Sequence, residues 1–315
     1  MKILVIDFVH DCLISGLKDC GHEVIYFPEL TRTGLLEQAA EMEGLVVRTK
    51  TMIDAEVLSH AVKLKFIGRA GAGLDNIDTA WCNKHNIICF NAGEANADAV
   101  GEQALGMLLA LYSNIVKADR EVRSRIWDRL GNTGRELKGN TVGIIGYGNT
   151  GKAFARKLSG MGVRVITYDK YLENYSDAFA TQAEMNQLFD ESDVLSFHVP
   201  LTGETLNMGN SAFFERFRKS ICLLNLSRGG VVNLADLKEA MVRQKVWSAG
   251  LDVLENEQLE TLSAEQAERF EFLASSANTV LTPHTGGWSV ESYQRISEVL
   301  LKKIKDISPC EQGGK

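Results

Sequence analysis

The chain has 315 residues, 45% hydrophobic and 24% charged, which is typical of a globular protein with room for two domains. Its net charge is −7 without a long basic run, which argues against nucleic acid or an anionic membrane as the partner. The longest apolar stretch, residues 104–112, is too short to span a bilayer, and the six scattered cysteines include no C-x-x-C pair. We therefore expect a cytoplasmic protein without a metal site.

Short apolar runs alternate with helical patterns over the first 96 residues. The first run begins at Met1 and has too short an apolar core for a signal peptide, so it is interpreted as a strand. Strands are predicted at residues 3–6, 23–27, 44–47, 66–67 and 87–90. Helices are predicted between them, for example at residues 11–18 and 54–61. This alternation favours a parallel sheet covered by helices.

A long apolar pattern at residues 97–114 predicts a mostly buried helix that could join two domains. The charged, glycine-containing segment that follows, residues 119–137, includes Trp127. A tryptophan in such a segment fits an arm at a subunit interface, although local packing is an alternative.

A glycine-rich turn follows the apolar run at residues 141–145 and precedes a predicted helix at 152–158. The turn reads Gly146-Tyr147-Gly148-Asn149-Thr150-Gly151. Its first glycine permits a tight turn, its second lets the backbone approach a pyrophosphate, and its third lets helix pack on strand. The unpaired N–H groups at the helix N-terminus would bind the phosphates.

The next apolar run, residues 163–168, ends at Asp169. An acid at this spacing can accept hydrogen bonds from both ribose hydroxyls and would repel a 2′-phosphate. A bare G-x-G-x-x-G is also found in ordinary strand-to-helix turns. Strand, turn, helix and acid together predict a dinucleotide site that prefers NAD over NADP.

Three titratable or charged residues follow later predicted strands. Strands are predicted at residues 194–198, 221–226, 247–251 and 279–281, with a helix at 234–243. Arg228 follows the second of these strands, Glu257 the third and His284 the fourth. Because the carboxyl ends of parallel strands share one edge, we expect these residues to meet near a bound nicotinamide.

Their chemistry fits hydride transfer between a hydroxy acid and NAD. His284 could exchange the hydroxyl proton, and Glu257 could orient its imidazole. Arg228 could bind the substrate carboxylate bidentately. Taken singly, each could be a solvated turn residue, a surface charge or a packed loop histidine; their joint placement favours a site.

The last amphipathic pattern, residues 290–307, could cross back onto the first domain. The expected fold is α/β, with two Rossmann-like or flavodoxin-like doubly wound parallel sheets and a cleft between them. The predicted domains are residues 1–96 plus 289–315, which would bind substrate, and residues 97–288, which would bind NAD.

The chain resembles the D-isomer-specific 2-hydroxyacid dehydrogenases over essentially its full length. Besides the glycine turn, the matching stretches are Arg69–Asp78, His198–Thr202, Asn225–Gly230, Leu251–Val253 and Pro283-His284. The resemblance implies Arg228, Glu257 and His284 as the catalytic set. It also implies a homodimer that pairs through the NAD-binding domain, for which the segment 119–137 would be a suitable arm.

The same resemblance implies further contacts for cofactor and substrate. Asp252 would lie near the nicotinamide carboxamide, and the backbone of Ala70–Gly73 would bind the substrate carboxylate, as a glycine-containing loop can. The residues implied for substrate binding here are Ala70, Gly71, Ala72 and Gly73. Those implied for the cofactor are Gly146, Gly148, Asn149, Thr150, Gly151, Asp169, His198, Pro200, Thr205 and Asp252.

Within this family the chain is most similar to D-3-phosphoglycerate dehydrogenases. Arg48, Thr49 and Lys50 resemble their substrate loop, where two cations could bind a phosphate; a solvated basic loop is the alternative. Gln258 and Gly93 stand where the family usually has proline. The chain ends at Lys315 without the regulatory domain of longer relatives, so feedback by serine is not expected.

The sequence thus predicts an NAD-dependent enzyme that interconverts D-3-phosphoglycerate and 3-phosphohydroxypyruvate. A reductase of glyoxylate, hydroxypyruvate or another small 2-oxo acid is the first alternative. The second is an NAD-sensing protein similar to the family's transcriptional co-repressors, which retain the same three catalytic residues. The short segment after His284 argues against the co-repressor.

Overall fold

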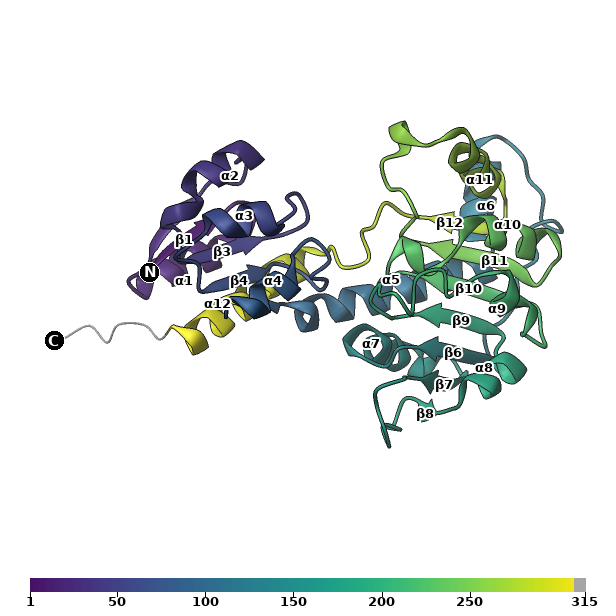
Figure 1. Ribbon diagram of the computed structural model, residues 1–315. Helices are drawn as coiled ribbons and strands as arrows, with labels where there is room; N and C mark the ends of the chain where they lie inside the picture. Colours follow the sequence, from purple (N-terminus) through teal and green to yellow (C-terminus); the bar gives the residue numbers. More distant parts are fainter. Residues whose placement is uncertain (309–315) are drawn as a thin grey trace. The chain divides into compact units, whose positions relative to one another are not determined.

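The computed structural model describes residues 1–308, which form two compact units. Unit 1 consists of residues 1–96 together with the segment that starts at Trp288. Unit 2 consists of Ala97–Gly287. Each contains one parallel sheet, so the predicted fold class, two α/β domains with parallel sheets, is confirmed (Figure 1).

Unit 1 contains a five-stranded sheet in the order β2-β1-β3-β4-β5, all parallel. The strands are β1 (Lys2–Val5), β2 (Glu23–Tyr26), β3 (Gly44–Val47), β4 (Phe66–Arg69) and β5 (Ile88–Asn91). The helices are α1 (Asp11–Asp19), α2 (Arg32–Gln38), α3 (Ala55–His60), α4 (Thr79–Lys84) and α12 (Val290–Ile307).

Both faces of this sheet are buried, as parallel sheets require. Successive residues of β1 point to opposite faces: Ile3 packs with α1 and α12, and Leu4 packs with α2, α3 and α4. The amphipathic C-terminal helix therefore contributes to the core of unit 1, although it is distant in sequence from the strands.

Unit 2 contains a seven-stranded parallel sheet in the order β12-β11-β10-β9-β6-β7-β8. The strands are β6 (Thr141–Ile145), β7 (Arg164–Tyr168), β8 (Thr181–Gln182), β9 (Val194–Phe197), β10 (Ile221–Asn225), β11 (Val246–Leu251) and β12 (Thr279–Leu281). Because all pairs are parallel, the carboxyl ends of the strands lie along one edge. The sequence did not predict β8, a polar two-residue strand.

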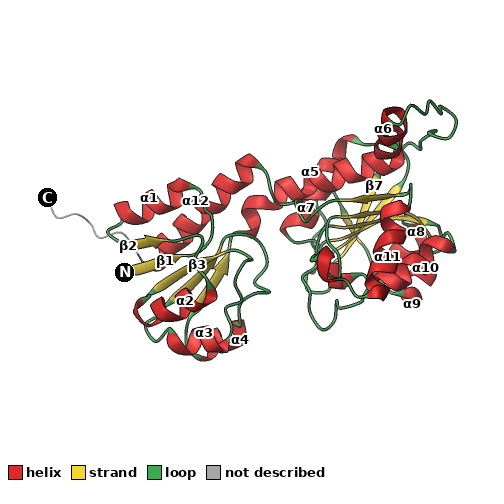
Figure 2. Cartoon of the chain, turned by 90° about the horizontal axis from the view of Figure 1, so that it is seen from above, coloured by secondary structure: helices red, strands yellow, loops and turns green. Residues whose placement is uncertain are grey.

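Helices cover both faces of the second sheet (Figure 2). They are α5 (Gly93–Tyr112), α7 (Asn149–Lys157), α8 (Met185–Glu191), α9 (Ser211–Glu215), α10 (Leu234–Val242) and α11 (Ala264–Ser275). The remaining helix, α6 (Ile115–Arg123), has no buried residue. Four 3-10 segments complete the two units: Ala39–Glu41, Leu158–Gly160, Gly229–Val231 and Leu259–Thr261. No single helix within residues 1–308 is long and apolar enough to cross a membrane; α5 and α6 meet the requirements of length and composition only as a pair, with a 63° bend between them.

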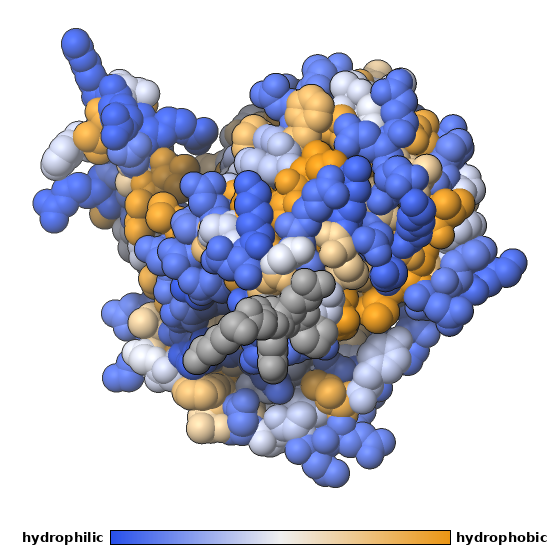
Figure 3. Space-filling view, turned by 90° about the vertical axis from the view of Figure 1, so that its left-hand side faces the viewer, coloured by the Kyte–Doolittle hydropathy of each residue, from blue (hydrophilic) through white to orange (hydrophobic). Residues whose placement is uncertain are grey.

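Apolar side chains on the surface lie in patches between hydrophilic ones, as on the face drawn in Figure 3. In unit 2, α6 and the loop after it carry several of the most exposed apolar side chains. These are Ile115, Val116, Val122, Ile126, Trp127 and Leu130. They overlap the segment 119–137, which the sequence marks as a candidate arm.

Candidate active site

The glycine turn lies between β6 and α7, at the carboxyl edge of the sheet in unit 2. A Cβ at Gly146, whose φ is 93°, would collide with the backbone oxygen of His198, and one at Gly151 would collide with the oxygen of Gly146. Only glycine fits these two positions. A Cβ at Gly148 would meet no atom within 4 Å, so open space lies beside it.

That open space faces the N-terminus of α7. Gly148 is its N-cap and supplies no side-chain hydrogen bond, and both Gly148 and Asn149 are exposed. The first-turn N–H groups and the positive end of the helix dipole are therefore accessible to an anion. The residues fit a dinucleotide pyrophosphate at this turn.

Asp169 follows β7 and lies beside the same turn. Its Oδ2 accepts the N–H of Tyr147 at 2.8 Å, and its Oδ1 accepts the N–H of Tyr171 at 2.9 Å. The Tyr175 hydroxyl accepts the N–H of Asp169 at 2.7 Å. The carboxylate is thereby fixed next to the glycine turn, where an acid can bind the ribose hydroxyls.

His198, predicted as a cofactor contact, has a buried side chain that packs within unit 2. Its Nε2 lies 2.8 Å from Ser196 Oγ and its Nδ1 3.1 Å from Thr150 Oγ1, and its ring stacks on Phe154. Burial lowers the pKa of His198 to about 3, so the ring is neutral. The imidazole thus ties β9 to the first turn of α7.

The loop after β9 contains the other two predicted cofactor contacts of this region. The Thr205 hydroxyl is buried and donates to the carbonyl of Pro200 at 2.6 Å, which fixes the loop. Pro200 itself is exposed. Among His198, Pro200 and Thr205, only Pro200 presents an exposed surface to a ligand.

His284 and Glu257 form a pair beyond the ends of β12 and β11. His284 Nδ1 lies 3.0 Å from Glu257 Oε2, and both side chains are about half exposed. His284 has a φ of 54°, the left-handed region that non-glycine residues seldom adopt. This backbone is stabilised by Asp252, whose carbonyl accepts the N–H of His284 at 2.8 Å.

The Asp252 carboxylate is buried and fully engaged with the His284 loop. Its Oδ1 accepts the N–H of Thr285 at 2.9 Å and the hydroxyl of Thr282, and its Oδ2 accepts the N–H of Gly286 at 2.8 Å. The sequence missed this role, because it depends on contacts between residues about 30 positions apart.

Arg228 follows β10 on a loop that Asn225 organises. The Asn225 side chain accepts the N–H of Ser227 at 3.1 Å and donates to the Arg228 carbonyl at 3.0 Å. A Cβ at Gly229 would collide with the oxygen of Leu254, so the Arg228 loop packs directly on the segment that leads to Glu257. Arg228, Glu257 and His284 thus follow three neighbouring strands of one sheet.

In unit 1, Arg48 lines an open hollow of about 610 Å³ with Asp7, Thr49, Trp288 and Tyr293 among its neighbours. Its guanidinium carbon lies 4.7 Å from the Trp288 ring centre and 5.7 Å from that of Tyr293. Burial lowers the pKa of Arg48, which nevertheless remains charged at neutral pH.

Lys50 does not line this hollow. Its Nζ donates to the carbonyls of Pro28 at 2.6 Å and Leu30 at 3.1 Å, and it borders a different hollow with Arg32 and Asp54. Arg48 and Lys50, which from the sequence could bind one phosphate together, thus line different hollows.

The predicted carboxylate loop after β4 has two groups available to an anion. The N–H of Ala70 donates to Val47 and that of Gly71 donates to Arg69. Among residues 1–308, the N–H groups of Ala72 and Gly73 have no hydrogen-bond acceptor. Two of the four predicted donors thus serve the fold.

Comparison with known proteins agrees with this architecture. Residues 105–286 match the profile of the D-isomer specific 2-hydroxyacid dehydrogenase, NAD binding domain. The chain belongs to the D-isomer-specific 2-hydroxyacid dehydrogenase family. The part of unit 2 that carries the glycine turn, Asp169 and the three candidate catalytic residues is this family's NAD-binding domain, so NAD is its cofactor.

Three relatives illustrate the range of this dehydrogenase family. The chain is 32% identical to D-3-phosphoglycerate dehydrogenase of Archaeoglobus fulgidus, over 98% of this chain but only 57% of that protein. It is 34% identical to hydroxypyruvate reductase of Thermotoga maritima, over 87% of this chain and 88% of that protein. D-lactate dehydrogenase of Aquifex aeolicus, solved with NAD and lactic acid, has a TM-score of 0.83, 25% identity and coverage of 98% and 95%.

Proposed function

We propose that this protein is an NAD-dependent dehydrogenase that interconverts a D-2-hydroxy acid and a 2-oxo acid. The observation that carries the proposal is the pair of His284 Nδ1 and Glu257 Oε2, 3.0 Å apart, at the carboxyl edge of the NAD-binding sheet. A carboxylate on Nδ1 leaves Nε2 to exchange a proton with a ligand.

NAD, when bound, accepts or donates the hydride, and the chain's own residues do the rest. In the direction of reduction, His284 Nε2 gives a proton to the oxygen that becomes the hydroxyl, while Glu257 stabilises the imidazolium. Arg228 binds the substrate carboxylate and polarises the neighbouring carbonyl. In the reverse direction, neutral His284 accepts the hydroxyl proton.

Within this reaction class, we favour a small unphosphorylated 2-oxo acid such as hydroxypyruvate. A phosphate would require several donors, but Arg48 alone of the Arg48–Lys50 pair lines the hollow, and Asp7 shares it. The similarity to phosphoglycerate dehydrogenases keeps 3-phosphohydroxypyruvate as the second candidate. In unit 1 we propose Arg48, Thr49 and the N–H groups of Ala72 and Gly73 as substrate contacts.

The test is NADH oxidation by the purified protein with hydroxypyruvate, glyoxylate, pyruvate and 3-phosphohydroxypyruvate. We expect turnover with an unphosphorylated acid and a loss of about 10²-fold or more in kcat for His284→Ala, with NADH affinity nearly unchanged. No oxidation with any of these acids, together with intact NADH binding, would instead favour an NAD-sensing protein.

The Lys50→Ala variant separates the two substrate candidates. If the ammonium contacts only the carbonyls of Pro28 and Leu30, kcat/KM for every acid in the panel should change about equally. A selective loss with 3-phosphohydroxypyruvate would show that Lys50 binds a phosphate and would reverse our preference. The same measurements on Arg48→Lys serve as the comparison, because Arg48, unlike Lys50, lines the hollow where we propose that substrate binds.

We also propose a homodimer formed through the NAD-binding domain. On α6 and the loop after it, Trp127 is 79% exposed and Leu130 is 88% exposed, and exposed apolar groups of this size favour association. Light scattering with size exclusion should give twice the chain mass. The double variant Trp127→Glu and Leu130→Glu should give the monomer mass; a native protein of one-chain mass would refute the proposal.

A further inference from the structure

Glu257 is held by a loop, because it lies between the end of β11 at Leu251 and the start of α11 at Ala264. Its side chain is 46% exposed, so packing does not fix it opposite His284. A partly exposed carboxylate on an unrestrained loop would stay near its partner for only part of the time, because the position of its backbone would vary as well as its rotamer. The two residues that precede Glu257 provide such restraints.

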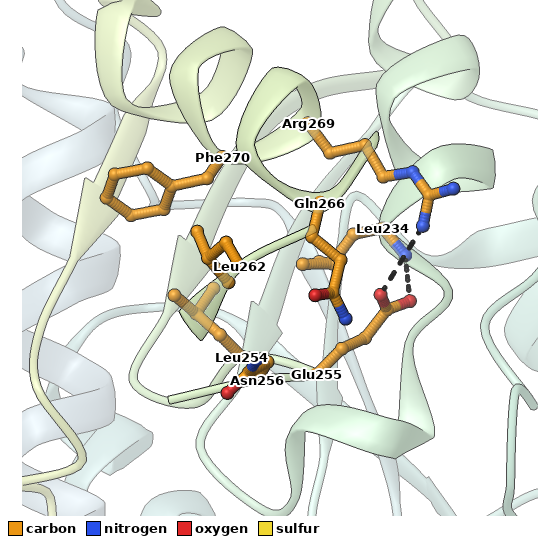
Figure 4. A pocket seen from close by; sticks show the side chains of 8 residues that line it. All are labelled: Leu234, Leu254, Glu255, Asn256, Leu262, Gln266, Arg269 and Phe270. Carbon is orange, nitrogen blue, oxygen red and sulfur yellow. Dashed lines mark hydrogen bonds and ion pairs between the residues drawn. The ribbon is translucent and has the colours of Figure 1, made fainter. Parts of the chain in front are cut away.

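Glu255 ties this loop to two helices. Its Oε1 accepts the N–H of Leu234, the first residue of α10, at 2.8 Å, and its Oε2 lies 3.7 Å from Arg269 Nη1 on α11. The side chains of Glu255 and Arg269 are only 20% and 26% exposed. Figure 4 shows the Glu255 carboxylate joined by dashed lines to both partners, in a pocket that Leu254 and Leu262 also line.

Asn256 restrains the part of the loop that follows Glu257. Its Oδ1 accepts the N–H of Gln258 at 2.9 Å, and its Nδ2 donates to the Thr261 hydroxyl at 3.2 Å. That hydroxyl in turn donates to the carbonyl of Gln258 at 2.9 Å. These bonds close a small turn with Glu257 at its centre.

The second restraint depends on the residue at position 258. A proline there would have no N–H group to donate to Asn256. The same arrangement recurs at the other position that resembles a family proline, where the N–H of Gly93 donates to Asn91 Oδ1 at 3.4 Å. At both positions, an asparagine two residues earlier forms a hydrogen bond that a proline would not allow.

We propose that Glu255 and Asn256 are positioning residues that keep the Glu257 carboxylate at Nδ1 of His284. This rests on the proposed roles of Glu257 and His284. When Glu257 is held in place, the imidazolium is stabilised and the imidazole orientation is fixed. Loosening the loop weakens both effects without removing any group that contacts substrate or cofactor.

The test compares Glu255→Ala and Asn256→Ala with the conservative variants Glu255→Gln and Asn256→Asp. Glu255→Gln keeps an acceptor for Leu234, and Asn256→Asp keeps one for Gln258. Glu265→Ala is the matched control, because Glu265 also pairs with Arg269, at 3.4 Å, but is 84% exposed and lies outside the loop. Each protein is assayed for reduction across pH, for NADH affinity and for melting temperature.

We expect the two alanine variants to lower kcat by about 5- to 100-fold, with KM and NADH affinity changed far less. The alkaline limb of kcat/KM should move to lower pH, because a less stabilised imidazolium loses its proton earlier. The conservative variants Asn256→Asp and Glu255→Gln should keep kcat and the alkaline limb of kcat/KM close to the wild-type values.

A double-mutant cycle distinguishes positioning from general damage. In a Glu257→Gln background, Asn256→Ala should have no further effect on the pH limb, since the carboxylate it positions is gone. An equal effect in both backgrounds, or an unmoved alkaline limb of kcat/KM in the alanine variants, would overturn the positioning role. If Glu257→Gln itself leaves turnover and pH dependence at wild-type values, the proposed function of Glu257 fails instead.

Discussion

Gly286 donates its N–H to the buried carboxylate of Asp252 at 2.8 Å. The same carboxylate accepts the N–H of Thr285, so one side chain fixes the loop that presents His284. The contacts of Asp252 within unit 2 thus hold in place the loop that carries His284, the residue proposed to exchange the proton. The coupling explains how His284 keeps a left-handed backbone.

Asp252→Asn should destabilise the protein and misplace His284. An amide has only one oxygen, so at least one buried N–H loses its acceptor, which costs about 1–3 kcal/mol. Urea unfolding at pH 7 should show this loss, and turnover should fall more than NADH affinity. Asp190→Asn, at an exposed position, is the control. Unchanged stability in Asp252→Asn would contradict the bracing role.

The glycine turn allows a matched test with two alanine substitutions. Gly148→Ala places a methyl group in open space, so the melting temperature should hold while NADH affinity falls about tenfold or more. Gly151→Ala forces a methyl group against the backbone oxygen of Gly146, which should destabilise the fold by about 1–3 kcal/mol. Fluorescence titration and thermal melts measure the two effects. If Gly148→Ala binds NADH normally, the pyrophosphate does not lie at this turn.

Removing the charge of Asp169 should reduce the discrimination against NADP. Asp169→Asn keeps an acceptor for the N–H of Tyr147 but no longer repels a 2′-phosphate. The ratio of the NADPH and NADH dissociation constants should fall at least about tenfold. Asp177→Asn, which alters the nearby acceptor of the Tyr147 hydroxyl, controls for local rearrangement. An unchanged ratio would remove Asp169 from the ribose site.

His198 should make stability fall with acid. Burial lowers the pKa of His198 to about 3, whereas an unfolded histidine titrates near ~6.5. Between these values the unfolded chain binds the extra proton, so this contribution to stability is complete above pH ~6.5 and is lost as the pH falls toward 3. For one proton, the free energy of unfolding changes by at most about 1.4 kcal/mol per pH unit.

Urea unfolding of the wild type and of His198→Asn between pH 7 and 5 isolates this contribution. The variant is expected to be less stable at pH 7, because Asn cannot replace the ring contact with Phe154. The difference in the free energy of unfolding between the wild type and the variant should become smaller as the pH falls. If the free energy of unfolding depends on pH equally in both proteins, the His198 ring can be protonated in the folded state.

The sequence could predict those parts of the site that depend on residues close together in the chain. The alternating apolar runs and the three glycines near Ile145 reflect local geometry, so strands, glycine turn and Asp169 could be placed from residues alone. The pairing of His284 with Glu257 could be expected too, because parallel strands bring their carboxyl ends to one edge. The two-residue strand β8 could not be predicted, because two polar residues are too few to show an alternating pattern.

Other features were decided only in three dimensions. Whether Lys50 meets the same ligand as Arg48 depends on the carbonyls of Pro28 and Leu30. That the His198 ring would be buried against α7 depends on Thr150 and Phe154. Sequence alone determined the two sheets and the nucleotide turn, because backbone periodicity and glycine sterics are local. Tertiary structure decided which polar groups face a ligand and which brace the fold, because that depends on partners brought together from distant segments of the chain.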